Sequence, residues 1–478
     1  MRRPIELAFG ATALALLSAS AHAACPAGAI SLPVGSHIGQ RAQTAPEGAV
    51  FCIRAGIHRL QRVQPRDRQR FYGEPGAIMN GSQRITRFER EGVYWVATGQ
   101  TQRGIRHATQ ECLPERPRCS YPEAFFINNV PLLSVASKAA VEPGSFFFDY
   151  ARDRIYFLDN PTGKIVEASV RPYAFASAAR DVLIKGLTVE KYSTPIQAGA
   201  IGSNIAPKDW IIRRNEVRLN HAVGIVVGAG SRIQENFAHS NGEMGVGCAG
   251  DDVLIEHNEM AHNGYFAGLD PLWEGGGGKC SLTNHLIVRG NYSHHNNSFG
   301  FWTDIDSINT LYEDNRIEHN ANGGIAHEIS YAAIIRRNTF KGNGAAFRDW
   351  LWGGAIQIQN SQNVQVYRNT IDTADAGNGI TLIQQNRGTG KYGPYVTVRN
   401  NIHHNVITNP TPDRGVSGAI ADHNPAAMKA GHNRFEFNVY TVTDPRDDHW
   451  AWVDGFYDWT TYRRKSSQDA SSRLVLGP

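Results

Sequence analysis

Two acidic residues near the middle of the chain are spaced so that their carboxyl groups could act together in catalysis. Asp304 lies in Gly300-Phe-Trp-Thr-Asp-Ile-Asp306 and Glu328 in Gly324-Ile-Ala-His-Glu-Ile-Ser330, two stretches that look like one strand written twice. Neighbouring strands lie about 4.8 Å apart, so the two carboxyls would stand side by side. A retaining glycosidase needs its carboxyls about 5 to 5.5 Å apart, and the spacing therefore suggests that mechanism.

Strict alternation along the two strands predicts which side chains share the outer face. With Phe301, Thr303 and Ile305 inward, the outward set is Trp302, Asp304, Asp306, Ala326, Glu328 and Ser330. His327 then points inward beside Thr303, where it would orient an acid from behind. If the strand bends, His327 joins the catalytic group instead.

Asp304 and Asp306 form a rival pair on one strand. Two residues along a strand are about 6.6 to 7 Å apart, a separation that suits an inverting mechanism. Acids on a sheet face can also simply be solvated, bind a structural ion or cap a turn.

Enlarged connections at 268–284 and 345–353 are expected beside these acids, where loops on a rigid face would form a cleft. Aromatic side chains there would give a pyranose ring an apolar surface. The candidate substrate-binding residues are Asp270, Trp273, Glu274, Lys279, Trp302, Tyr331, Arg348, Trp350, Trp352 and Gln357.

Two other classes of function stay open. A polysaccharide lyase or C5-epimerase needs a base, for which Lys279, His327, Arg348 and Tyr331 are the candidates, and a neutralised uronate carboxylate. A carbohydrate-binding solenoid without catalysis needs none of these groups.

A repeat of asparagines indicates how the acids are positioned. Each anchor closes an apolar run, and the separations are 21, 22, 33, 24, 23, 31 and 31 residues along Asn215, Asn236, Asn258, Asn291, Asn315, Asn338, Asn369 and Asn400. A second asparagine follows five residues later at 220, 241, 263, 296, 320, 343 and 405. A unit of about 22 residues with inserted loops is typical of one coil of a parallel β-helix. The predicted fold is all-β.

A strand that follows a glycine recurs in each coil and predicts one long sheet face. It is expected at Gly224, Gly245, Gly268, Gly300, Gly324, Gly379 and Gly418. Histidines 262, 295, 319 and 404 each precede an asparagine of the repeat. We interpret them as side chains that stack at the turns of successive coils. We do not expect a metal site, because the histidines recur along the solenoid instead of converging at one point.

Four segments are expected. Residues 1–23 have the pattern of a secretory signal peptide with cleavage after Ala23. Residues 24–181 are expected to form an N-terminal cap coil and a β-rich insertion. Residues 182–425 are expected to form the parallel β-helix core, and 426–478 an irregular C-terminal extension. The chain is thus expected to be secreted or periplasmic. Removing the signal leaves 46 basic and 43 acidic residues (48 − 2 and 44 − 1), a net charge of +3.

This balance is compatible with a saccharide partner and does not demand nucleic acid. No stretch beyond the N-terminus is apolar enough to span a membrane, so no membrane partner is expected. No cofactor is expected, and the oligomeric state stays open. Six cysteines in an exported chain suggest disulfides with fifteen possible pairings. Sequence proximity proposes Cys112–Cys119 first, followed by Cys25–Cys52 and Cys248–Cys280.

The repeat over about 180–425 resembles the right-handed parallel β-helix proteins of the pectin-lyase-like superfamily. Phe301-Trp-Thr-Asp304 and Ile325-Ala-His-Glu328 are similar to the paired strand motifs of the β-helix β-xylosidases, glycoside hydrolase family 120. The resemblance implies that Asp304 is the nucleophile and Glu328 the general acid/base. This chain differs by having Asp306 and by the Ile-Ser-Tyr331 that follows Glu328.

Overall fold

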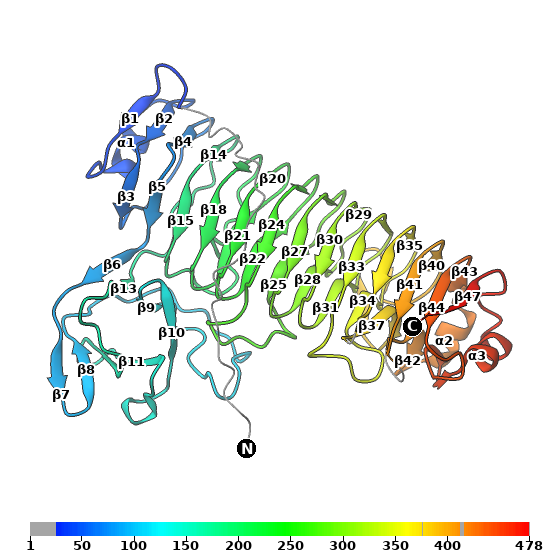
Figure 1. Ribbon diagram of the computed structural model, residues 1–478. Coiled ribbons are helices and arrows are strands. Elements are labelled where there is room, and N and C mark those ends of the chain that lie inside the picture. The colour runs from blue at the N-terminus through cyan, green and yellow to red at the C-terminus, as the bar shows by residue number, and fades with distance from the viewer. Residues whose placement is uncertain (1–24, 375, 412–414, 478) are drawn as a thin grey trace.

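The computed structural model describes residues 25–374, 376–411 and 415–477, and the expected signal peptide lies outside them (Figure 1). The chain winds into an elongated parallel β-helix, which confirms the predicted fold class. Three long sheets form its sides. No helix in the described part of the chain is long and apolar enough to cross a membrane.

Sheet A and sheet B each hold thirteen parallel strands. Sheet A comprises β1 (Ile30–Leu32), β2 (Val50–Ile53), β4 (Arg70–Gly73), β14 (Leu183–Lys185), β17 (Ile211–Arg213), β20 (Arg232–Gln234), β23 (Leu254–Glu256), β26 (Ile287–Arg289), β29 (Thr310–Glu313), β32 (Ala333–Arg336), β35 (Val364–Tyr367), β40 (Asn401–His403) and β43 (Arg434–Glu436). Sheet B comprises β3 (Gly56–Arg59), β5 (Ala77–Asn80), β15 (Thr188–Glu190), β18 (Glu216–Arg218), β21 (Phe237–His239), β24 (Glu259–Ala261), β27 (Tyr292–His294), β30 (Arg316–Glu318), β33 (Thr339–Lys341), β36 (Thr370–Asp372), β41 (Val406–Asn409), β44 (Val439–Val442) and β47 (Arg473–Leu476).

Sheet C is the recurring face predicted from the sequence. It comprises β16 (Gly199–Ile201), β19 (Val223–Val227), β22 (Met244–Ala249), β25 (Gly276–Ser281), β28 (Phe299–Asp304), β31 (Gly323–Glu328), β34 (Gly354–Gln359), β37 (Asn378–Gln384), β42 (Ser417–Ala421), β45 (Trp450–Val453) and β46 (Gly455–Tyr457). One expectation is wrong here. The strand expected directly after Gly268 is instead β25, which begins at Gly276 within the run of four glycines. The residues between Gly268 and β25 form a connection.

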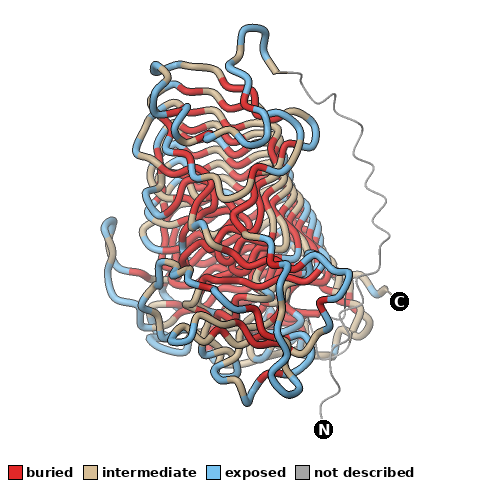
Figure 2. The backbone as a smooth tube through the Cα atoms, turned by 90° about the vertical axis from the view of Figure 1, so that its left-hand side faces the viewer, coloured by how far each residue is buried: buried red, intermediate tan, exposed pale blue. Residues whose placement is uncertain are grey.

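The interior is a continuous apolar stack, buried along the whole length of the tube in Figure 2. On sheet C its members repeat at one register position: Ile225, Val246, Phe301, Ile325, Ile356 and Ile380. Close packing explains the glycine run, because a Cβ on Gly277 would lie 2.3 Å from the carbonyl oxygen of Gly300. Burial of these side chains supplies the main driving force for stacking coils.

Two asparagine ladders run along the corners. At the corner between sheets A and B, each side-chain oxygen accepts the backbone and amide N–H groups of the asparagine one coil before, from Asn215 through Asn291 to Asn369. The second ladder, from Asn220 to Asn343, lies between sheets B and C. The assignment of asparagines to the first ladder from the sequence is wrong at one coil. Asn405, not Asn400, continues the first ladder after Asn369, and His404 therefore lies at a different corner from His262, His295 and His319.

The domain boundaries differ from the expected ones. The first coils already belong to the solenoid, because β1, β2 and β4 pair in sequence with β14. At the other end the sheets continue through β43, β44, β45 and β47, so a core ending at 425 would divide a continuous stack.

The expected insertion is an eight-stranded, mainly antiparallel sheet beside the N-terminal coils (Figure 1). Its strands are β6 (Ser82–Ile85), β7 (Glu89–Glu91), β8 (Tyr94–Ala97), β9 (Phe125–Ile127), β10 (Val130–Ser134), β11 (Ser145–Asp149), β12 (Arg154–Phe157) and β13 (Val166–Ser169). A short 3-10 helix, η1 (Lys138–Ala140), precedes β11. A loop of this insertion reaches the connection that precedes β25, where the N–H of Leu113 donates to the Gly268 carbonyl at 3.0 Å.

Short helices cover the ends of the stack. From α1 (Ile38–Thr44), Ile38 and Ala42 are fully buried in the core at the N-terminal end. At the C-terminal end α2 (Pro425–Ala430) buries Met428 and α3 (Trp459–Ser466) buries Tyr462. All three predicted disulfides form: Cys25–Cys52, Cys112–Cys119 and Cys248–Cys280.

Candidate functional site

The two candidate acids end neighbouring strands of sheet C. Thr303 of β28 pairs with His327 of β31, so the next position in this register places Asp304 beside Glu328. Both side chains lie on the outer face, opposite the core stack, and the residues are only 9% and 7% exposed. The predicted juxtaposition of two carboxylates on adjacent coils is therefore present.

Glu328 is held by one aromatic and one cationic neighbour. The indole Nε1–H of Trp302 donates to Glu328 Oε2 at 3.1 Å, and the Arg387 guanidinium donates to Oε1. Burial raises the pKa of the Glu328 carboxyl, and the negative charge of Asp304 raises it further. Arg387 and Lys279 oppose this shift but do not cancel it. This carboxyl therefore holds its proton to a higher pH than an exposed glutamate does.

Asp304 has a different partner. Its Oδ2 lies 3.1 Å from the Lys279 ammonium, and its Oδ1 accepts the N–H of Ile305 at 2.9 Å. Burial alone would lower the pKa of Lys279, but the charges of Glu274 and Asp304 raise it overall. Lys279 therefore stays positively charged beside Asp304. The same ammonium lies 3.9 Å from the Trp302 ring centroid, a cation–π contact.

A second acid pair lies on the far side of Lys279. Glu274 Oε2 is 2.9 Å from the ammonium, and burial raises the pKa of Glu274 despite that contact. Glu243, fully buried next to it, has its pKa raised by burial and by the charge of Glu274. The backbone N–H of Gln197 donates to one Glu243 oxygen at 2.8 Å.

An apolar patch and an amide complete the floor. Trp302 packs with Phe299 and Ala326 on the outer face, with the two rings 5.3 Å apart. Gln357 pairs in register with Ala326, and its buried side-chain oxygen has no hydrogen-bond partner among the described residues. The site thus offers one indole, one open acceptor and several carboxylates.

Asp306 does not share the face of Asp304, contrary to the alternation argument. The strand ends at Asp304, and Ile305 and Asp306 both adopt left-handed backbone conformations, with φ of 47° and 56°. Ile305, expected inside, is 42% exposed. Asp306 instead accepts hydrogen bonds from the Tyr395 hydroxyl and the Lys391 N–H, both at 2.8 Å.

Asp306 and Tyr331 anchor a loop rather than face the acids. The loop carries the hairpin β38 (Thr389–Gly390) and β39 (Gly393–Pro394), and the Tyr331 hydroxyl donates to the Gly393 carbonyl at 2.8 Å. The same loop supplies Arg387 to Glu328. Its attachment therefore fixes a residue of the site.

His327 lies in the core, as the buried interpretation expects. Its Nε2 lies 2.6 Å from the Tyr331 carbonyl, so it donates there, and Nδ1 accepts from the Thr303 hydroxyl at 2.6 Å. Burial lowers the pKa of His327 to about 4. It is neutral and on the opposite face of the strand from Glu328, where it can position that strand without touching a ligand.

Two other expected binding residues have structural partners. Asp270 caps its own turn by accepting the Leu272 N–H at 2.9 Å. Trp273 packs against the Cys112–Cys119 loop of the insertion and Leu269, while its carbonyl accepts from Lys279 at 3.1 Å.

Trp350 and Trp352 lie farther along sheet C than expected. They pack on an apolar group that contains Ile383 and Ile420. Ile383 pairs with Gln359, and Gln359 pairs with Glu328. This apolar group therefore begins two coils beyond Glu328. Arg348, in the same loop, donates to the Ala376 carbonyl at 3.4 Å.

Sequence reasoning did not find Arg387, Glu243 or Gln197 as members of this group. Arg387 follows Glu328 by 59 residues and reaches it from a loop. Glu243 precedes β22 in a coil whose later positions are small and apolar. No spacing in the sequence marks either residue.

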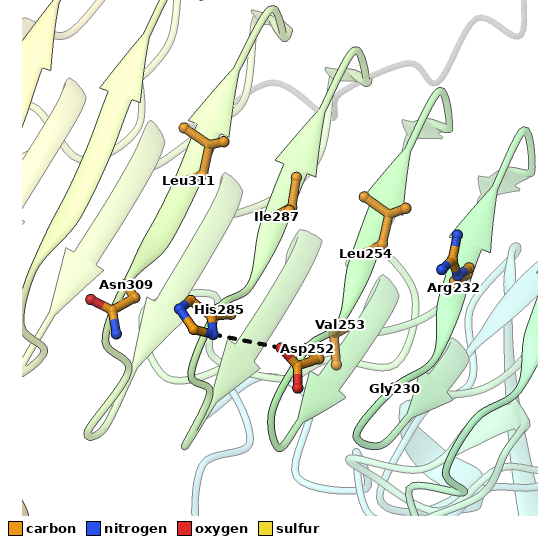
Figure 3. Close-up of a pocket in the computed structure, with 9 residues that line it drawn as sticks. All are labelled: Gly230, Arg232, Asp252, Val253, Leu254, His285, Ile287, Asn309 and Leu311. Atoms are coloured by element: carbon orange, nitrogen blue, oxygen red, sulfur yellow. Dashed lines mark ion pairs between the residues drawn. The ribbon is translucent and has the colours of Figure 1, made fainter.

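A shallow groove of about 600 Å³ lies elsewhere, along sheet A and its preceding turns (Figure 3). Its floor is formed by Leu254, Ile287 and Leu311, and an ion pair between His285 and Asp252, 3.6 Å apart, crosses its rim. The groove has no paired acids. The chemistry-bearing group remains on sheet C.

Comparison with known proteins agrees with this architecture. A family model described as the right-handed β-helix region matches residues 201–371. The chain is a right-handed parallel β-helix.

The solved structure of XylC in complex with xylose is similar to this chain, with a TM-score of 0.64, 15% identity, and coverage of 92% of this chain and 82% of that chain. The A-module of the mannuronan C-5 epimerase AlgE6 of Azotobacter vinelandii matches with a TM-score of 0.46, 12% identity, and coverage of 92% and 93%. No curated protein matches. The likeness to XylC shows the fold.

Proposed function

We propose that this protein is a retaining glycoside hydrolase in which Asp304 is the nucleophile and Glu328 the general acid/base. The observation that carries the proposal is the pair of outward carboxylates on adjacent strands with different neighbours. Strands about 4.8 Å apart give a separation close to the 5 to 5.5 Å of retaining enzymes. XylC was solved in complex with xylose, which is consistent with a sugar ligand for this fold.

The expected mechanism has two steps. Glu328 donates its proton to the glycosidic oxygen as the bond from that oxygen to the anomeric carbon breaks, and an Asp304 oxygen bonds to the same carbon. Glu328 then takes a proton from water, the water oxygen bonds to the anomeric carbon, and the Asp304 carboxylate leaves. The elevated pKa of Glu328 suits the first step, and the Lys279 ammonium lies 3.1 Å from Asp304, where it can receive the carboxylate released in the second step.

The surroundings favour a neutral sugar. Glu243, Glu274, Asp304 and Glu328 bring four carboxyls, against the two cations Lys279 and Arg387, which already pair with them. Trp302 is only 5% exposed and so offers a sugar ring little surface, and the unpaired Gln357 oxygen is itself buried. A uronate would add another negative charge to this group without an unpaired cation to receive it.

The alternative of a lyase or epimerase is less well supported by the geometry. The pKa of Lys279 is raised, so it is charged and a poor base. His327 lies in the core and the Tyr331 hydroxyl donates to a backbone carbonyl. An unsaturated, ultraviolet-absorbing product from a uronate polymer would favour this alternative over hydrolysis.

The test compares Asp304→Asn and Glu328→Gln with Asp314→Asn as a matched control, since Asp314 is an exposed acid that pairs with Arg337. On a panel of neutral aryl pyranosides, loss of the acid/base should lower kcat/KM about 10²- to 10⁴-fold. The loss in E328Q should be smaller for leaving groups that need no protonation. D304N should lose turnover with every leaving group.

NMR of the first-formed product should show retention of anomeric configuration. Inversion of the anomeric configuration would indicate that Asp304 acts as a base and not as a nucleophile. Turnover that is unchanged in both acid variants would place catalysis at other residues, and the absence of turnover in wild type would leave a carbohydrate-binding solenoid without catalysis.

A further inference from the structure

Three histidine side chains converge at the corner between sheets B and C, apart from the acids. His294 is the last residue of β27, His295 follows it, and His262 occupies the corner one coil earlier. Their ligand nitrogens all lie within 4.8 Å of one another. We propose that His262, His294 and His295 bind a divalent transition-metal ion, with Zn²⁺ as the reference ion.

The backbone explains why the rings meet. His262 and His295 both have left-handed conformations, with φ of 55° and 52°, which direct their side chains to the same side of successive coils. Their rings stack with centroids 5.3 Å apart. His294, on the strand next to this file, brings the third ring, 5.7 Å from His262 and 5.1 Å from His295.

The nitrogen spacing suits a metal after small ring rotations. The Nδ1 atoms of His294 and His295 are 2.9 Å apart. Zn–N bonds of about 2.0 to 2.1 Å in a tetrahedron place two nitrogens about 3.4 Å apart. His262 and His295 are exposed and can turn without displacing core atoms.

His294 is the oriented member of the group. Its ring stacks on Tyr292 at 4.0 Å, and its Nε2 lies 3.2 Å from a Glu259 carboxylate oxygen. A hydrogen bond from Nε2–H to that carboxylate leaves the Nδ1 lone pair facing His295. A carboxylate behind a histidine is the usual support of a metal ligand, because it fixes the tautomer and strengthens the donor.

A second histidine pair in the chain provides a contrast. His403 and His404 repeat the close contact, with Nδ1 atoms 2.9 Å apart. The flanking rings are Tyr367 and Phe437, at 5.1 and 5.2 Å. Within the described ranges, the group at His262 has three imidazoles that converge, whereas the pair at His404 has two, and two imidazoles bind Zn²⁺ more weakly than three.

The experiment uses the full mature chain after removal of metal by a chelator. Zn²⁺ is titrated calorimetrically into wild type, His262→Asn, His295→Asn and the control His404→Asn. Asparagine is chosen because it tolerates the left-handed backbone of all three positions. Melting of each metal-free protein checks that the coils are intact.

One Zn²⁺ should bind per chain in wild type and H404N, with a dissociation constant at least tenfold lower than in H262N and H295N. Added Zn²⁺ should raise the Tm of the first two proteins only. Equal affinity in all four proteins would mean adventitious binding elsewhere and overturn the site, as would the absence of binding in wild type. Neither readout depends on glycosidase activity.

Discussion

Glu328 and Asp304 carry the same functional group but have different neighbours. Glu328 is desolvated beside Trp302 and feels the charge of Asp304, whereas Asp304 contacts the Lys279 ammonium directly. Pairs of titratable groups whose environments differ in this way are what acid/base and nucleophilic roles require. In the proposed mechanism, the division of roles therefore follows from residues that do not react.

Arg387 provides a test of this residue-scale account. Its cation favours the charged form of Glu328, so Arg387→Met should raise the pKa of Glu328 further. Because Glu328 must be protonated to act as the acid, the alkaline limb of kcat/KM against pH should move to higher pH.

The control for this profile is Arg337→Met, which removes a cation paired with Asp314 at another corner. Its pH profile should match wild type. A limb that stays in place, or moves to lower pH in R387M, would show that Glu328 is not the titrating acid.

At the scale of elements, the corner ladders hold adjacent coils in register. Asn291 is 2% exposed, accepts from the backbone and side-chain amides of Asn258, and donates to the Ile255 carbonyl and to Asn315. Register matters because a shift of one residue would turn Asp304 or Glu328 to the opposite face.

Asn291→Ala should therefore destabilise the fold by about 2 to 4 kcal/mol, since it leaves buried donors and acceptors without partners. Urea unfolding followed by circular dichroism measures the loss. Asn204→Ala, at an exposed asparagine, should change the free energy of unfolding by no more than about 0.5 kcal/mol. Similar losses in both variants would argue against a special contribution of the ladder.

At the scale of the whole molecule, the insertion supports the site across a long sequence distance. The Glu111 carbonyl accepts the Asp270 N–H at 2.9 Å, and Leu113 bonds Gly268, within a loop closed by Cys112–Cys119. The braced segment leads into Glu274, which contacts Lys279. The insertion thus reaches Asp304 through three successive contacts.

Replacing Cys112 and Cys119 by serine should lower kcat/KM about tenfold, because a small displacement at the reacting centre is costly. The Cys25 and Cys52 double serine variant opens a disulfide at the N-terminal end and should keep its activity at temperatures where both proteins are folded. Equal activity in the two variants would show that the insertion does not support the site.

The sequence was sufficient for the coil and for the acid pair, because both depend on local periods. The asparagine spacing marks each corner, and alternation places Asp304 and Glu328 together. Alternation failed at Asp306, where two left-handed residues end the strand. Arg387 could not be predicted, because its approach to Glu328 depends on a loop anchored by Asp306 and Tyr331 and not on any repeat.

The helices at the two ends have a consequence for association. A stack of identical coils presents open strand edges on which another copy could continue the pattern. Here α1 buries Ile38 and Ala42 over one end, while α3 buries Tyr462 and β46 turns back antiparallel on β45 at the other. These elements bury apolar side chains at both ends of the stack, and at sheet C the last parallel strand pairs with a strand of its own chain.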